Sequence, residues 1–485
     1  MSNWLLLAAS VAAVVGAITV LPEPLCWWVS GAIGLLALAW QAWRSRPDPK
    51  LVAEFGGFRW DRQTFCRHWQ ITGTTGSGKT VSGVNQLLFQ LFKNQPQFGA
   101  LLIDEKGTLK ETLVAMAAHF GRSDDVILLQ VRPPEAAPDW TPRHRLNLTS
   151  DRTIPLATYA RCVVDTAVAM GSRQEQSFFR RAGQILIEQG LAALVALDYE
   201  VTLENVHRLV TDLNELKGVV TALKARKETE LARALQSFLD QPPEQRSGTV
   251  SSVANYLHSY TTPEIGEVFC RDSTFSLADI DRGKILCLAL PQRFQVERRY
   301  LGTFLKQLFY LHVLRRFDLS KVERLDRNLL VLLMDEAQHV VRASEDGLSD
   351  HSLVDVVREA GAAVIAATQS TTSLIPTLGV EAAKVLGLNL RNRIIFTAAD
   401  EDDARASAEF LGKEIIRERS VTRSEGKRSE TWSEREEYRV KPHIMRALKA
   451  HHCILVHAER GYRRCVLPPL EPDGRVSPWF RRFRI

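Results

Sequence analysis

The sequence has 485 residues, of which 45% are hydrophobic and 24% are charged, a globular balance that excludes a wholly disordered or fibrous chain. Its formal net charge of +6 is unevenly spread: residues 1–43 carry one charged side chain, Glu23, whereas the other 442 residues hold 62 basic and 55 acidic groups. A short apolar segment joined to a large charged body fits neither a purely soluble enzyme nor a polytopic transporter.

The first 43 residues predict a transmembrane helical hairpin. Residues 4–21 and 26–43 are uncharged runs of 18 residues each, separated by Pro22, Glu23 and Pro24. A helix needs about 20 apolar residues, and no fewer than about 17, to span a bilayer, and the prolines break the helix between the runs. A signal peptide and a buried hairpin of a soluble core fit less well, because the first run has no basic start and neither run contains a charge.

The basic residues that follow the second run predict the orientation of this hairpin. Arg44, Arg46 and Lys50 come directly after it, and basic residues next to a span stay on the cytoplasmic side of the membrane. We therefore expect the N-terminus and the main body to be cytoplasmic, with only the turn around Glu23 on the other side.

The segment 73–80 fits the phosphate-binding pattern G-x-x-x-x-G-K-[ST] without a mismatch. Its glycines let consecutive backbone N–H groups point at phosphates, while the lysine reaches the β- and γ-phosphates and the last hydroxyl binds magnesium. The strand and the helix that must flank such a loop are predicted at 69–72 and 84–92. The predicted nucleotide-binding residues are Thr72, Gly73, Thr74, Thr75, Gly76, Ser77, Gly78, Lys79 and Thr80, and Thr80 is also a predicted magnesium ligand.

A second segment supplies the carboxylates that nucleotide hydrolysis needs. Six apolar residues, 329–334, run into Asp335 and Glu336. In such a strand end the first carboxylate holds the magnesium shell and the second orients and deprotonates the attacking water. A core strand followed by an acidic turn is the simpler interpretation of this segment alone. Its combination with the loop at 73–80 favours Asp335 as a magnesium ligand and Glu336 as the catalytic base.

Two further predicted strands end in polar residues. The strand 362–367 leads to Gln369, whose amide would contact the γ-phosphate, although an N-cap for the next helix is an alternative role. The strand 100–103 leads to Asp104. Strands with polar carboxyl ends, separated by helical segments, predict a parallel α/β sheet with its site at one edge. Seven scattered cysteines without a CxxC pair argue against a zinc site, and we interpret 451–453 as a turn before a strand.

Taken in order, these segments resemble the coupling ATPases of conjugative type IV secretion, the inner-membrane DNA-transfer proteins within the wider FtsK/HerA group of DNA pumps. The resemblance covers nearly the whole chain. It is carried by the two apolar runs ahead of the phosphate-binding loop and by segments 104–107, 147–148, 176–179, 358–361, 368–370, 400–404, 410–412 and 440–442.

The resemblance implies an α/β fold: a RecA-like P-loop NTPase domain with an inserted all-α domain and an N-terminal two-helix transmembrane hairpin. The corresponding segments are the hairpin at 1–43, the two parts of the nucleotide-binding domain at 44–149 and 276–470, the insertion at 150–275, and a basic–aromatic tail at 471–485. The residues of 150–275 favour helices independently, because they are rich in Ala, Leu, Gln, Glu and Arg and poor in β-branched runs.

The resemblance also implies a function. It is that of a homo-hexameric ring in the bacterial inner membrane that uses ATP and magnesium to move DNA, single- or double-stranded, toward a type IV secretion channel. A relaxase, channel components and membrane lipid would be its partners. By position, Arg358 would be the arginine that one subunit supplies to its neighbour's phosphates; the alternative is a helix-end arginine paired with a surface carboxylate.

Two other functions remain open at this point. One is a docking receptor that selects proteins for a secretion channel, with hydrolysis secondary; the other is a membrane-bound DNA pump unrelated to conjugation. The small positive excess of the body does not demonstrate DNA binding. The tail, with Trp479, Phe480 and several arginines, would bind phosphates and bases, bind anionic lipid, or be solvated.

Overall fold

The computed structural model describes residues 50–482 apart from 138, 172–176, 345–347 and 425–426. The chain divides into two compact units, Met1–Leu51 and Val52–Ile485, and the second contains the sheet and the site. The predicted transmembrane hairpin at 1–43 lies outside the described residues. Within the described ranges, every helix is too short or too polar to cross a bilayer.

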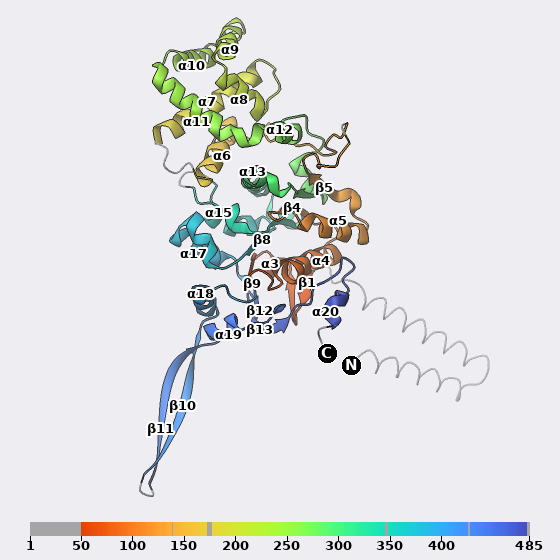
Figure 1. Cartoon of the computed structure of the whole chain (residues 1–485), viewed down its shortest axis with the longest axis vertical. Helices are drawn as coiled ribbons and strands as arrows, with labels where there is room; N and C mark the ends of the chain where they lie inside the picture. Colours follow the sequence, from red (N-terminus) through yellow and green to blue (C-terminus); the bar gives the residue numbers. More distant parts are fainter. Residues whose placement is uncertain (1–49, 138, 172–176, 345–347, 425–426, 483–485) are drawn as a thin grey trace, which may run out of the picture. The chain divides into compact units, whose positions relative to one another are not determined.

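A nine-stranded sheet, in the order β13-β12-β9-β3-β8-β7-β4-β6-β5, is the centre of the second unit (Figure 1). The strands from β9 to β5 are mutually parallel, which confirms the predicted parallel α/β sheet. An antiparallel edge, β12 with β9 and β13, was not predicted. The strands are β3 (Trp69–Thr72), β4 (Gly99–Ile103), β5 (Val126–Leu129), β6 (Ile285–Leu288), β7 (Leu330–Met334), β8 (Ala362–Thr368), β9 (Asn392–Ile395), β12 (His452–His457) and β13 (Gly461–Val466).

The central strands are buried on both faces, because successive side chains of a strand point to opposite sides and helices cover both. In β4, Leu101 and Ile103 belong to one hydrophobic core and Ala100 and Leu102 to the other. The first core includes residues of α13 (Gln295–Leu314) and α15 (Asp350–Glu359). The second includes residues of α3 (Arg62–Phe65), α4 (Asn85–Asn94) and α5 (Leu109–His119).

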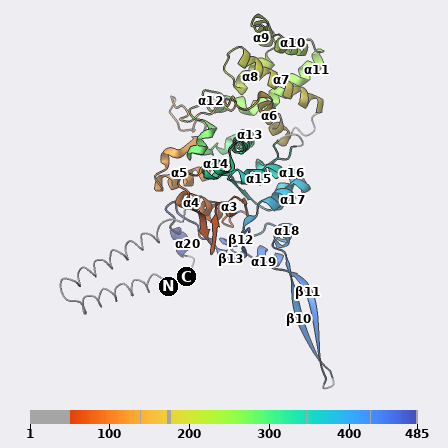
Figure 2. The ribbon, with the colours of Figure 1, turned by 180° about the vertical axis from the view of Figure 1, so that it is seen from behind.

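The chain between β5 and β6 is helical. Its helices are α6 (Leu156–Ala169), α7 (Ser177–Ala196), α8 (Leu203–Thr211), α9 (Leu213–Ala225), α10 (Thr229–Leu239), α11 (Pro243–Thr261) and α12 (Pro263–Phe269). Two of them begin at capping side chains: Thr202 accepts from the Asn205 N–H, and Asp212 accepts from the Asn214 N–H, which is the role that such residues favour at an N-cap. Figures 1 and 2 both show α7 to α11 lying side by side.

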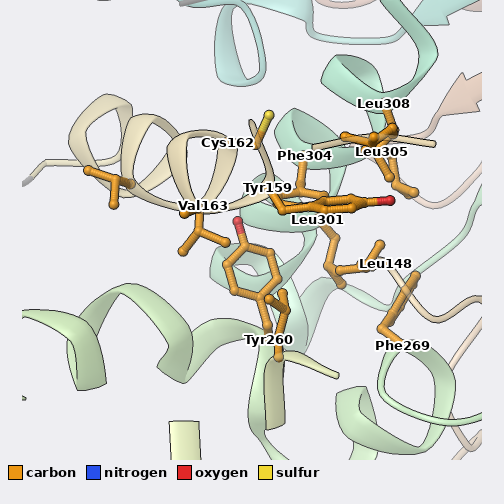
Figure 3. Packing of buried hydrophobic residues seen from close by; sticks show 14 of the residues in the cluster. Leu148, Tyr159, Cys162, Val163, Tyr260, Phe269, Leu301, Phe304, Leu305 and Leu308 are labelled. Carbon is orange, nitrogen blue, oxygen red and sulfur yellow. The ribbon is translucent and has the colours of Figure 1, made fainter. Parts of the chain in front are cut away.

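This helical segment shares its core with the sheet domain. Figure 3 shows Tyr159 of α6 and Tyr260 of α11 facing Leu301 and Phe304 of α13. The rings of Tyr260 and Phe304 meet edge to face, 5.5 Å apart. Because α13 also packs on the sheet, burial of these side chains joins the insertion to the nucleotide-binding part.

Other elements complete the unit. The strands β10 (Lys413–Ser424) and β11 (Lys427–Tyr438) form a two-stranded antiparallel hairpin, and Figures 1 and 2 show it extending away from α18 and α19. The others are β1 (Leu51–Phe55), β2 (Phe58–Asp61), the π-helical turn η1 (Lys79–Val84), the 3₁₀ turn η8 (Thr372–Leu374), α14 (Lys321–Asp326), α16 (Ile375–Leu378), α17 (Val380–Asn389), α18 (Glu401–Leu411), α19 (Pro442–Arg446) and α20 (Pro478–Arg482).

Candidate nucleotide-hydrolysis site

The phosphate-binding loop connects β3 to η1 and α4, the strand–loop–helix context that the motif requires. The three glycines of the loop, Gly73, Gly76 and Gly78, have φ values of 154°, 80° and 107°. Residues with a Cβ rarely adopt such backbone angles. At Gly73 a Cβ would also lie 2.6 Å from Phe396 Cβ and from Ser77 Oγ. Only glycine therefore fits the start of the loop.

Hydrogen bonds fix the curled loop. The Ser77 hydroxyl donates to the Thr74 carbonyl (2.7 Å), and the Thr74 N–H donates to the Thr397 carbonyl after β9 (3.0 Å). Thr75 and Gly76 are exposed at the tip, and Thr80 is half-buried at the start of η1. Thr72, at the end of β3, is buried, and its hydroxyl has no hydrogen-bond partner in the described part of the chain. These are the predicted nucleotide-binding residues, and they form one continuous loop.

Lys79 is buried inside this loop. It is 5% exposed, and its Nζ donates to the Gly73 carbonyl over 2.6 Å. Burial lowers the pKa of Lys79, although Glu336 acts in the opposite direction. The ammonium is thus held beside the backbone of the curled loop, where its charge is weakly screened by water.

Replacement of Lys79 by Ala is expected to weaken ATP binding by roughly 10- to 100-fold, because a hydrogen bond to a charged group contributes about 1.5–3 kcal/mol. Titration of the full chain with a fluorescent ATP analogue measures the change. Lys93→Ala is the matched control, since Lys93 is an exposed lysine in the last turn of α4. Equal affinities of the two variants would contradict the assignment of Lys79.

Asp335 lies beside the loop at the carboxyl end of β7. It is fully buried, and neither carboxylate oxygen has a hydrogen-bond partner among the described residues. Burial raises the pKa of Asp335 to about 6. A buried carboxylate without a partner destabilises the fold, and a bound magnesium ion would give its oxygens a partner. Asp335 and Thr80 therefore fit a magnesium ion bound to a nucleotide, where the ion would neutralise charge on the phosphates.

Glu336, the predicted catalytic base, follows in a left-handed backbone conformation (φ 50°). Its Oε1 pairs with the Lys106 ammonium (2.6 Å), and its Oε2 accepts from the Gln338 amide (2.7 Å). Burial alone would raise the pKa of Glu336, but these contacts with Lys106 and Gln338 outweigh it and lower the pKa. The carboxylate is thus ionised and held. Lys106, in the segment 104–107, was not among the predicted site residues.

Gln369 follows β8, the strand between β3 and β7. Its carbonyl accepts from the Gly73 N–H (3.3 Å), and the residue is exposed at the sheet edge. The next turn, η8, has Thr371 as its N-cap, and the Ser373 N–H inside it donates to the Ser370 hydroxyl (3.0 Å). Gln369 therefore lies beside the phosphate-binding loop, and it is not the N-cap of the turn that follows.

Arg358 lies away from the site of its own chain. It is in the last turn of α15, just before β8 begins, whereas the phosphate-binding loop follows the carboxyl end of β3. Because β3 and β8 are parallel, Arg358 lies at the amino ends of the strands, and the phosphate-binding loop lies at their carboxyl ends. Its guanidinium lies 3.3 Å from Asp355, a half-exposed partner one turn earlier. Within one subunit Arg358 is thus a helix-end arginine beside a surface carboxylate.

Two residues that the sequence analysis did not assign support the loop. Asp403, at the start of α18, accepts from the Thr371 N–H (2.7 Å) and the Ala399 N–H (3.1 Å), and so ties together the segments after β8 and β9. The backbone N–H of His451 donates to the Ser77 carbonyl (2.8 Å). Neither is close in sequence to the loop, and no local pattern indicates them.

His451 also joins the C-terminal segment to the loop. Its Nδ1 lies 2.8 Å from Ser82 Oγ, and the rings of Trp479 and Phe480 in α20 lie 5.5 and 5.1 Å from its imidazole. Of the turn predicted at 451–453, only His451 is a turn residue, because β12 begins at His452. Among the described residues, groups of acidic, histidine or cysteine side chains that could hold a metal by themselves are absent.

A P-loop followed by a helix, with Asp335 and Glu336 two strands away, defines a nucleotide-binding protein of the RecA-like α/β type. Comparison with known proteins identifies the class within that type. A family model described as type IV secretory system conjugative DNA transfer matches residues 40–460. The chain therefore belongs to this family, the coupling proteins of type IV secretion. No curated protein matches the chain.

Solved structures share the fold. The conjugative coupling protein TrwBΔN70 in its unbound monoclinic form is 17% identical, with a TM-score of 0.66 over 90% of this chain and 92% of that one. TrwB bound to ADP and Mg²⁺ is 16% identical, with a TM-score of 0.61 over 88% and 91%. VirB4 of Thermoanaerobacter pseudethanolicus is 13% identical, with a TM-score of 0.50 over 89% and 97%. These likenesses establish a common fold.

Proposed function

We propose that this chain is an inner-membrane ATPase that couples ATP hydrolysis to the recruitment and movement of DNA, as a relaxase–DNA complex, toward a type IV secretion channel. The observation that best supports ATP hydrolysis is that Lys79, Asp335 and Glu336 lie close together at the carboxyl ends of the parallel strands. Family membership over residues 40–460 supports conjugation as the process.

ATP and magnesium are the proposed ligands of the site. The curled backbone of the loop and Lys79 would hold the phosphates, Thr80 and Asp335 would hold the metal, and Glu336 would take the proton of the attacking water. Related structures support this choice, since TrwB has been solved with an ATP analogue, ADPNP, and with ADP and Mg²⁺.

The proposed setting is the cytoplasmic face of the bacterial inner membrane. The two apolar runs within residues 1–43 and the basic residues after them support an anchor in lipid with the body in the cytoplasm. A relaxase and components of the secretion channel are the proposed protein partners, and a homo-hexameric ring is the proposed assembly.

In such a ring we expect Arg358 to act on the phosphates of the neighbouring subunit. Its place at the sheet edge opposite the phosphate-binding loop supports this role, because it lies away from the site of its own chain. Arg358→Ala should leave ATP binding unchanged and lower the turnover of the assembled ring by roughly 10³-fold, as loss of an arginine finger does.

Mixing subunits tests whether this effect crosses an interface. Rings assembled from Arg358→Ala and Glu336→Gln subunits should hydrolyse ATP faster than either variant alone, because some sites then receive both groups. Asp355→Ala is the control for the local ion pair. If mixing restores nothing, or if Asp355→Ala lowers turnover as strongly, Arg358 has no role in a neighbour's site.

Displacement of a bound oligonucleotide tests DNA movement. The full chain in lipid nanodiscs is given ATP and duplex or single-stranded DNA that carries a third-strand or streptavidin block. A DNA pump should remove the block only with ATP and with intact Glu336. A protein that hydrolyses ATP but never displaces a block from either DNA form would instead fit a docking receptor.

A further inference from the structure

An ion pair with a buried carboxylate connects Glu336, the proposed catalytic base, to the turn after the neighbouring strand. The turn 104–107 follows β4, Glu336 follows β7, and β4 and β7 are adjacent parallel strands with Ile103 opposite Met334. Lys106 Nζ lies 2.6 Å from Glu336 Oε1, with the lysine side chain 39% exposed and the glutamate side chain 4% exposed. The Glu336 carboxylate is therefore shielded from water, whereas the Lys106 ammonium that pairs with it remains partly exposed.

The backbone that carries Lys106 is rigidly held. Asp104 accepts from the N–H groups of Gly107 (2.8 Å) and Leu109 (2.7 Å), and this closes the turn. Glu105 is paired with the buried Arg298 (3.0 Å), and the Gln292 amide donates to the Lys106 carbonyl (2.9 Å). The backbone is thus fixed from both sides, whereas the Lys106 side chain reaches partly into solvent and is free to change its partner.

Glu336 is held at both oxygens, by Lys106 and by Gln338. A general base must accept a proton from water at hydrogen-bond distance, and an oxygen whose charge is already neutralised by a neighbouring ammonium (2.6 Å) is a weaker acceptor for that proton. With both oxygens held in this way, the carboxylate lies beside the phosphate-binding loop but is a poor acceptor for a proton from water.

We propose that Lys106 is a positioning residue that restrains Glu336 through this ion pair, and that hydrolysis requires the ion pair to open. The inference rests on the proposed role of Glu336 as the base. Lys106 is near enough to Lys79 for its charge to oppose that of the other ammonium. The γ-phosphate that Lys79 would bind would therefore lie near Lys106, and its negative charge would compete with Glu336 for the same ammonium.

Turnover in the absence of DNA is the first test, measured on the full chain in nanodiscs. Lys106→Met removes the charge and keeps the length, so turnover without DNA should rise by roughly 2- to 5-fold, the range expected when a partly exposed ion pair is lost. Turnover with DNA should change less. Lys106→Arg should restore the wild-type rates, and Lys110→Met, a nearby lysine at the start of α5, is the matched control.

The outcomes show whether Lys106 restrains Glu336 or assists it as a base. Equal losses of turnover with and without DNA in Lys106→Met would show that Lys106 assists the base and would overturn the proposal. So would rates equal to those of Lys110→Met. If the wild-type chain itself shows no ATP turnover, the proposed function is wrong, and the second test decides the ion pair.

That second test is a double-mutant cycle in thermal unfolding and does not depend on hydrolysis. The shifts in Tm of Lys106→Met and Glu336→Gln should be non-additive in nucleotide-free protein, because each variant removes the same contact. They should become additive when ATP analogue and Mg²⁺ are bound. Additive shifts in both states would show that the ion pair does not form, and coupling that persists with nucleotide would show that it does not open.

Discussion

Replacement of Glu336 by Gln is expected to leave ATP binding intact and to slow turnover by roughly 10²- to 10⁴-fold, the contribution of a positioned general base. The amide is close in size to the carboxylate and can remain beside Lys106 and Gln338, but it takes no proton from water. Phosphate release from the full chain and binding of an ATP analogue, measured on the same preparation, give the two quantities.

The matched control for this variant is Glu111→Gln, an exposed glutamate in the first turn of α5. It should bind and hydrolyse ATP like the wild type. Normal turnover of Glu336→Gln would show that another group deprotonates the water, and the assignment of this site would be wrong.

The second large effect is a gain in stability that accompanies loss of activity. Asp335→Asn should raise the free energy of unfolding of nucleotide-free, metal-free protein at pH 7.5 by on the order of 2 kcal/mol, because it removes a buried charge without a partner. The same variant should lose at least about 100-fold of its magnesium-dependent turnover, since the ligand of the ion is gone.

The gain should depend on pH in a defined direction. Burial raises the pKa of Asp335 from 3.8 to about 6, so the folded protein binds a proton that the unfolded chain releases between those values. Wild-type stability therefore falls as the pH rises through this window, and the advantage of Asp335→Asn is full above pH 6 and disappears toward pH 4. Urea unfolding in EDTA at both pH values measures it.

The control is Asp326→Asn, an exposed aspartate at the end of α14, which should change stability little at either pH. A lower stability of Asp335→Asn than of the wild type at pH 7.5 would show that the carboxylate has a partner that stabilises its charge. The orphaned state on which the magnesium assignment depends would then be incorrect.

The parts of the site that the sequence predicted are those set by local patterns. The loop at 73–80 and the strand before Asp335 are contiguous motifs, and their order along the chain predicts the parallel sheet that brings them together. The predicted strand at 329–334 corresponds to β7, and the predicted helix at 84–92 to α4.

The parts that the sequence did not predict depend on contacts between distant segments. Lys106 and Glu336 are 230 positions apart and meet only because β4 and β7 are neighbours. His451 supports a loop that is more than 370 positions earlier, and the antiparallel edge of β12 and β13 follows from pairing that no short pattern encodes. The position of Arg358 opposite the site likewise appears only once the sheet is formed.

The central claim is that ATP hydrolysis at this site responds to DNA. The most direct test is the ATP turnover of the full chain in nanodiscs, without DNA and with single- or double-stranded DNA, with the assembly state recorded for each sample and Glu336→Gln as the blank. We predict that DNA raises turnover of the assembled form and that added salt weakens the stimulation, since phosphate contacts release counterions. An assembled protein that binds ATP and turns it over at one rate regardless of either DNA form would contradict this account.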